Sequence, residues 1–118
     1  SAQAAALAAL ADQAYLAEVV AQVLGSRAEI ARIAGACGLS VIPSATNFVT
    51  VDCGGNGDLA RAMVGSLGAR GVFVRMPFVA PQDRCIRVSC GTAADMAALE
   101  AAFAGALAEA REKVGATV

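Results

Sequence analysis

The chain has 118 residues, of which 58% are hydrophobic and 16% are charged, and its net charge is −1. This length suits one domain with a core of its own. The basic residues form no cluster, which argues against nucleic acid and anionic membranes as partners, since both need a concentrated positive field. A surface so poor in charge indicates that a partner chain or a further portion of the same polypeptide covers part of it.

No membrane-spanning segment is predicted. The longest uncharged stretch, residues 33–51, is interrupted by Gly35, Gly38 and Pro43 and has the pattern of a helix end, a turn and a strand. Residues 1–11 are too short to span a bilayer and lack the basic start of a signal peptide. Because the chain begins with Ser1 and opens directly into a helix, we expect a fragment of a longer, cytoplasmic protein.

The cysteines do not predict a metal site. Cys37, Cys53, Cys85 and Cys90 lack metal-ligand spacing, and the sequence contains no histidine. Cys85 and Cys90 are five residues apart on a predicted strand, so they point to opposite faces and cannot chelate together. We therefore expect small, buried side chains in a reducing cytosol.

The first half of the chain predicts a helix, a turn and a strand. Apolar residues recur at spacings of three and four from residue 3 to about residue 37, and Gly38 suits the left-handed position that ends a helix. Pro43 and Ser44 mark a turn, and residues 47–53 alternate as a strand. Val49, Val51 and Cys53 share one face of this strand, and Phe48, Thr50 and Asp52 share the other.

The second half predicts a helix, two strands and a last helix. The first of these helices covers residues 58–70 and is closed by Gly71. The strands cover residues 72–76 and 85–90. Thr92 and Asp95 have the spacing of a capping box and open the last helix.

This order, α-β-α-β-β-α, predicts an α+β fold. A strand–helix–strand unit normally forms a right-handed parallel crossover, so the third strand can lie antiparallel between the other two. We expect a three-stranded mixed sheet covered on one face by helices, preceded by a long N-terminal connecting helix.

Two arginines occupy the centres of neighbouring predicted strands. Alternation places Arg75 and Arg87 on the sheet face opposite the helices. One interpretation is that both side chains simply sit in water. The other is an oxyanion clamp, because a guanidinium group matches carboxylate and phosphate with a planar fork and keeps its charge. The chain offers no base or nucleophile beside them: it has no histidine, and its one lysine is Lys113.

Three motifs carry a family resemblance: PSATNFVTVDC at 43–53, ARGVFVR at 69–75 and CIRVSCGT at 85–92. In this order and spacing the chain resembles the C-terminal small domain of fold-type I pyridoxal-phosphate-dependent aminotransferases, in the histidinol-phosphate aminotransferase branch. The resemblance covers essentially residues 1–118 and implies that a large, cofactor-binding domain lies outside this chain. It also implies a cytoplasmic homodimer that acts on small amino compounds and 2-oxo acids.

The resemblance implies roles for three residues. Arg87 matches the arginine that binds the substrate carboxylate or phosphate, and Arg75 matches a second arginine that helps to hold the phosphate. Asn47 falls at the asparagine of the motif and is assigned to the substrate-binding site, either as a structural residue of the turn that enters the strand or in contact with the ligand. The Schiff-base lysine and the other residues that hold pyridoxal phosphate belong to the large domain, so we expect no catalytic, cofactor-binding or metal-binding residue in this chain.

Two alternatives stay open at the level of sequence. The same domain can serve a related pyridoxal-phosphate decarboxylase that acts on a phosphorylated amino acid, with Arg75 and Arg87 dividing carboxylate and phosphate differently. The second alternative is a non-catalytic α+β module that offers its open sheet face, with Phe48 and Phe73, to a protein partner.

Overall fold

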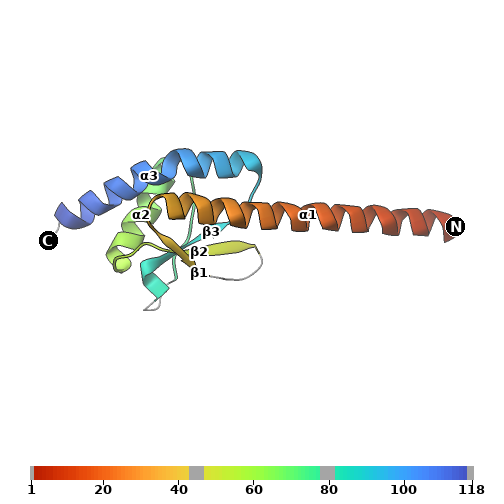
Figure 1. Ribbon diagram of the computed structural model, residues 1–118, viewed down its shortest axis with the longest axis horizontal. Helices are drawn as coiled ribbons and strands as arrows, with labels where there is room; N and C mark the ends of the chain where they lie inside the picture. The colour runs from red at the N-terminus through yellow and green to blue at the C-terminus, as the bar shows by residue number, and fades with distance from the viewer. Residues whose placement is uncertain (1, 43–46, 78–81, 117–118) are drawn as a thin grey trace.

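The computed structural model describes residues 2–42, 47–77 and 82–116 and consists of helices packed on a small sheet (Figure 1). The elements in chain order are α1 (Ala2–Ala36), β1 (Ser40–Ile42), β2 (Phe48–Asp52), α2 (Gly57–Ala69), the short 3-10 helix η1 (Gln82–Arg84), β3 (Cys85–Ser89) and α3 (Ala93–Ala116). The α+β class and the long N-terminal helix are confirmed. The turn predicted at Pro43 and Ser44 lies outside the described residues.

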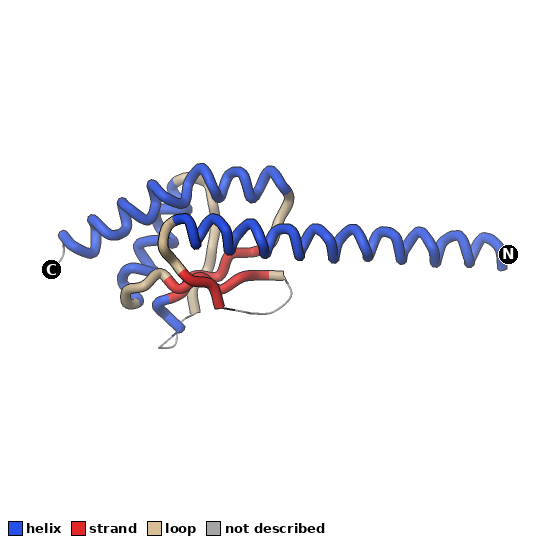
Figure 2. The backbone as a smooth tube through the Cα atoms, in the orientation of Figure 1, coloured by secondary structure: helices blue, strands red, loops and turns tan. Residues whose placement is uncertain are grey.

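The sheet has the order β1-β2-β3, with both pairs antiparallel. Val51 lies opposite Ile86 and Thr50 lies opposite Arg87. One face carries the buried core, and all three α-helices lie on this side of the strands (Figure 2). Its apolar strand residues pack with the helices in one cluster that includes Val49, Val51, Ile86, Val88, Ile30, Met63, Leu67, Leu99 and Phe103. The prediction that helices cover one face is confirmed.

The predicted strand order and the mixed sheet are wrong in detail. Residues 72–76 form no strand; Arg75 alone makes a bridge, with Arg87 of β3. An additional strand, β1, precedes β2, so the order is α-β-β-α-β-α. Every strand pair is antiparallel, because β3 separates β2 from the segment that contains Arg75. In the sheet itself β2 is the central strand, and β3 lies between β2 and Arg75 only through the single bridge. The three residues of β1 are too few to show an alternating pattern.

Local chemistry explains why the pairing beside β3 stops after one bridge. Hydrogen-bonded pairs in an antiparallel ladder recur at every second residue, so Phe73 and Pro77 would continue the pairing from Arg75. Pro77 has no N–H to donate. On the other side, the N–H of Val72 donates to the C=O of Leu67 at 2.9 Å, which holds the segment to the end of α2 rather than to β3.

The two helices that lead into the sheet end in the same way. Gly38 and Gly71 have φ of 79° and 82°, a left-handed conformation that glycine adopts without a steric penalty. The next residue then donates its N–H to a carbonyl in the last helical turn, from Leu39 to Ala34 and from Val72 to Leu67, each at 2.9 Å. Both helix ends predicted from the glycines are confirmed.

The last helix begins as its capping box predicts. The N–H of Thr92 donates to the Asp95 carboxylate at 2.9 Å, and the N–H of Asp95 donates to the Thr92 hydroxyl at 3.1 Å. These bonds satisfy two donors at the start of α3 and fix the direction in which the chain leaves β3. Among the described residues, no helix is both long and apolar enough to cross a bilayer.

One buried serine joins the long helix to the strand end that leads into α3. Ser26 of α1 is 4% exposed, and its hydroxyl donates to the C=O of Gly91 at 2.5 Å. The N–H of Gly91 donates back to the same oxygen at 3.2 Å. These two hydrogen bonds satisfy the backbone N–H and C=O of Gly91, and they join residues that are 65 positions apart in the sequence.

We expect Ser26→Ala to lower the free energy of unfolding by about 1–3 kcal/mol, since it leaves both backbone groups of Gly91 without their partner. Urea denaturation measures the change. Ser40→Ala on the exposed first residue of β1 is the matched control and should shift stability little. Equal free energies of unfolding for the two variants would show that the Ser26–Gly91 hydrogen bonds do not stabilise the packing of α1.

Candidate functional site

The bridge between Arg75 and Arg87 is the centre of the candidate site. The N–H of Arg75 donates to the C=O of Arg87 at 3.2 Å, and the N–H of Arg87 donates to the C=O of Arg75 at 2.6 Å. Residues that exchange both bonds in an antiparallel pair lie about 5.5 Å apart at Cα and project their side chains from the same face. Both residues are exposed, on the sheet face opposite the helices. Two cationic side chains therefore start side by side on the open face.

The aromatic ring of Phe48 lies beside one of these cations. The Cζ atom of Arg87 is 5.1 Å from the centroid of the Phe48 ring, within cation–π range. Phe48 is the first residue of β2 and is half-buried. The sequence predicted the correct face of the strand for Phe48. It did not predict that Phe48 contacts Arg87 on the neighbouring strand.

Neither Arg75 nor Arg87 has a carboxylate partner among the described residues, in contrast to four other arginines. Four arginines are committed to ion pairs: Arg32, Arg61, Arg70 and Arg84. Asp52, the acidic residue of β2, is paired with Arg84 at 2.7 Å and also accepts the N–H of Gly54. The charge that this face leaves uncompensated is therefore positive, which suits an anionic ligand.

Asn47 lies apart from the two arginines. It immediately precedes β2, and its backbone C=O accepts the N–H of Cys90 at 2.9 Å. It lines a hollow on the helix side of the sheet together with Arg27 and apolar residues of α1. The structure thus places Asn47 on the opposite side of the sheet from Arg75 and Arg87, where its backbone bond extends the β2–β3 pairing.

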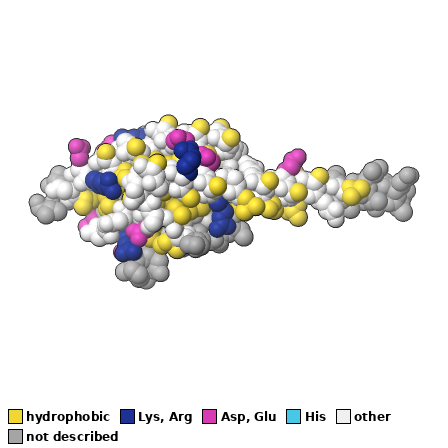
Figure 3. Space-filling model, viewed as in Figure 1, with side chains coloured by type: hydrophobic (Ala, Val, Ile, Leu, Met, Phe, Trp, Pro, Cys, Tyr) yellow, Lys and Arg dark blue, Asp and Glu magenta, His cyan; other side chains and the backbone are white. Residues whose placement is uncertain are grey.

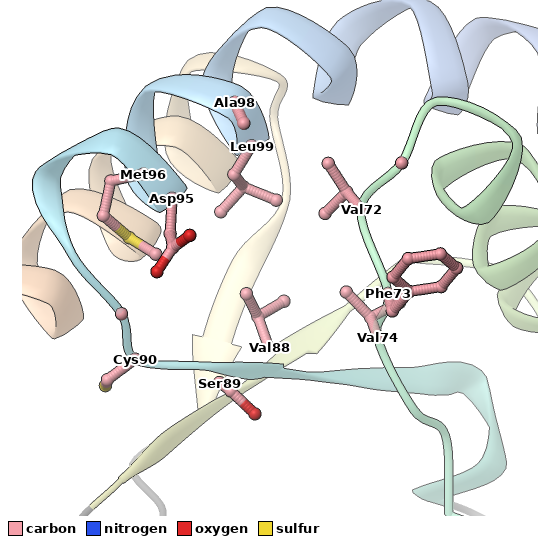
Figure 4. A pocket seen from close by; sticks show the side chains of 12 residues that line it. Val72, Phe73, Val74, Val88, Ser89, Cys90, Asp95, Met96, Ala98 and Leu99 are labelled. Atoms are coloured by element: carbon pink, nitrogen blue, oxygen red, sulfur yellow. The ribbon is translucent and has the colours of Figure 1, made fainter.

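A separate cavity of about 270 Å³ opens where residues 71–74 diverge from β3 (Figure 4). Val72, Val88 and Leu99 surround it, and Asp95 from the start of α3 stands beside it (Figure 4). The Asp95 carboxylate is already engaged in the capping box. Neither arginine lines this cavity, so the candidate site is the open face and not the cavity.

The long helix exposes apolar side chains where it leaves the body of the protein (Figure 3). Leu16, Val20 and Leu24 are 62%, 51% and 60% exposed, and Tyr15 is 70% exposed. Leu16, Val20 and Leu24 follow one another at helical spacing, and the N-terminal part of α1 extends away from the sheet and the other helices (Figure 1). An exposed stripe of large apolar side chains like this one normally marks a surface that another part of the structure covers.

The described residues hold no group of histidine, cysteine, aspartate or glutamate that could bind a metal ion. All four cysteines are free thiols. Cys53 and Cys85 are buried, as predicted, whereas Cys37 and Cys90 are only half-buried. Burial raises the pKa of the Cys53 thiol to about 12, with smaller contributions from Cys85 and Asp52. Burial also raises the pKa of the Cys85 and Cys90 thiols. Such thiols are poor nucleophiles near neutral pH.

Residues 1–103 match the family model described as aminotransferase class I and II. The chain belongs to this family. Among curated aminotransferases it is 40% identical over 94 residues to histidinol-phosphate aminotransferase 1 of Mesorhizobium japonicum, covering 80% of this chain and 25% of that protein. It is 37% identical over 101 residues to histidinol-phosphate aminotransferase of Marinomonas sp., covering 83% and 28%.

Solved aminotransferase structures share the fold. Histidinol-phosphate aminotransferase from Sinorhizobium meliloti, solved in complex with pyridoxal-5'-phosphate, aligns with a TM-score of 0.80 and 52% identity over 89% of this chain. A putative aminotransferase from Burkholderia pseudomallei aligns with a TM-score of 0.66 and 29% identity over 83% of this chain. The matched portion is 29% of each of those chains. The chain thus spans between a quarter and a third of the length of its relatives.

The raised pKa of Cys53 makes stability depend on alkaline pH. In the unfolded chain this thiol loses its proton near pH 9, whereas in the folded chain it keeps the proton up to about pH 12. Its contribution to stability is therefore complete below pH 9 and decreases above it, by at most about 1.4 kcal/mol per pH unit. We expect Cys53→Ala to flatten the decline in unfolding free energy between pH 9 and 10.5, measured by urea denaturation. Cys37→Ala is the control and should keep the original dependence of unfolding free energy on pH. If Cys53→Ala also kept it, the decline would not come from the Cys53 thiol.

Proposed function

We propose that this chain is the C-terminal, substrate-binding small domain of a pyridoxal-phosphate-dependent transaminase. Its family membership and the activity named for its relatives support this proposal. The observation that carries it is the backbone bridge that sets Arg75 and Arg87 side by side, without carboxylate partners among the described residues. The substrates are an amino acid or histidinol phosphate, as the amino donor, and a 2-oxo acid.

The two guanidinium groups suit these substrates because each substrate carries at least one oxyanion. Guanidinium binds carboxylate or phosphate through two parallel hydrogen bonds, and a strand fixes the orientation of its fork. Arg87 binds the carboxylate or phosphate of the substrate, and Arg75 adds a second set of donors to a phosphate. Both act by binding and orienting the substrate, which raises the specificity constant when the contact strengthens in the transition state.

We place the site for pyridoxal phosphate outside the residues that the structure describes. That cofactor requires a lysine for its Schiff base, and the one lysine, Lys113, is exposed in the last turn of α3. The cofactor and its lysine therefore belong to the large domain in the remainder of the longer polypeptide. The Sinorhizobium meliloti relative, about 29% of which aligns with this chain, was solved with pyridoxal-5'-phosphate.

The exposed apolar side chains of α1 support a larger assembly. Leu16, Val20 and Leu24 would be covered by the large domain of the same polypeptide, for which α1 serves as the connecting helix. The complete enzyme is a homodimer in the cytoplasm, where the four thiols stay reduced.

In the full-length protein we expect Arg87→Ala to lower kcat/KM for histidinol phosphate roughly thirty- to a thousandfold. Loss of a buried charge-assisted contact to the substrate typically costs about 2–4 kcal/mol in the transition state. The absorbance of bound cofactor should stay normal, because Arg87 does not hold it.

Arg111→Ala is the matched control, since Arg111 is an exposed arginine of α3 on the helix side of the sheet. Its kinetics should equal those of the unmodified enzyme. Unchanged kinetics in Arg87→Ala would overturn the proposed function.

A further inference from the structure

We propose that Phe48 is a positioning residue for substrate binding, which holds the Arg87 guanidinium in place through its ring. This inference rests on the proposed function, because it assigns Phe48 to the same anion site. Phe48 itself touches no reacting atom; it acts through Arg87. The distance of 5.1 Å between the Arg87 Cζ atom and the ring centroid is its starting point.

The register of the sheet makes this contact specific to one residue of β2. Thr50 lies directly opposite Arg87, and Phe48 lies opposite Ser89. Phe48 is therefore the diagonal neighbour of Arg87 on the same face, a separation that an aromatic ring and a long side chain can bridge. Thr50 has no ring and is too short to cover a guanidinium group.

A ring holds an arginine differently from a carboxylate. The ring attracts the face of the guanidinium group, so the N–H groups at its edge stay available for a ligand. The contrast within this protein is Arg84, which donates to Asp52 at 2.7 Å and so has part of its fork occupied. Contact with Phe48 restrains Arg87 and leaves its donors for an anion.

The restraint matters because Arg87 is exposed and adjacent to a second cation. A solvated arginine samples many rotamers, and binding a ligand must order them. Arg75 repels Arg87 across the bridge, which would otherwise bias both side chains away from a shared ligand. The Phe48 ring on the β2 side offers an attractive position that offsets part of this repulsion.

The test uses the full-length protein and two kinds of substitution at Phe48. Phe48→Leu and Phe48→Met remove the ring and keep an apolar side chain, whereas Phe48→Tyr and Phe48→Trp keep a ring. We expect the first two to raise KM for histidinol phosphate about two- to fivefold, with kcat nearly unchanged, and the latter two to retain the original KM. Calorimetric titration with inorganic phosphate should show the same pattern in Kd without turnover.

Phe73→Leu is the matched control, because Phe73 is 84% exposed and makes no cation–π contact with the described residues. It should leave KM unchanged. In the Arg87→Ala background, Phe48→Leu should add no further effect, since a residue that acts through Arg87 has nothing left to position.

The outcomes separate this inference from the proposed function. If Arg87→Ala weakens the enzyme while Phe48→Leu and Phe48→Met match the original KM, the positioning role is wrong and the proposed function stands. If Arg87→Ala itself has no effect, the proposed function fails. If all four Phe48 variants lose kcat equally, or if the effects of Phe48→Leu and Arg87→Ala add, Phe48 serves packing and the inference is overturned.

Discussion

The reciprocal backbone bonds between Arg75 and Arg87 are the constraint on which the site depends. They are the sole β-bridge that residues 72–76 make to a strand in the described structure, and they fix two cations on one face. Two like charges at about 4 Å repel by only ~1 kcal/mol in water, so an open face tolerates the pair. If a larger polypeptide covers this face, the repulsion grows unless an anion enters. The same arrangement that is mildly unfavourable when empty becomes favourable when occupied.

The rest of the domain can be understood as support for that bridge. The Gly71 turn directs the chain from α2 toward β3, and Pro77 prevents the pairing from continuing. The core under β3 holds the strand against α3, whose capping box fixes the chain just after the site. Restricting the pairing to one bridge leaves a single defined pair of arginines rather than a full fourth strand.

Sequence reasoning succeeded where the chemistry is local. Gly38, Gly71 and the Thr92–Asp95 pair predicted three helix boundaries, because each depends on residues within one turn. Alternation placed Arg75 and Arg87 on the open face and Val49 and Val51 in the core. These features require no knowledge of which segments meet.

The same reasoning failed where long-range pairing decides the outcome. Residues 72–76 alternate like a strand, yet only Arg75 bridges to β3, since the bond of Val72 to Leu67 holds the start of the segment to α2 and Pro77 has no N–H for a further pair. The three residues of β1 carry no pattern of their own. The contact between Phe48 and Arg87 depends on the register of β2 against β3, which the residues of either strand alone do not specify.

The most direct measurement is a crystal structure of the full-length protein with histidinol phosphate bound. We expect an oxyanion of the ligand to lie within hydrogen-bond distance of the Arg87 guanidinium, with Arg75 contacting the same phosphate and Phe48 still against Arg87. A ligand bound elsewhere, with both arginines directed into solvent, would contradict this expectation.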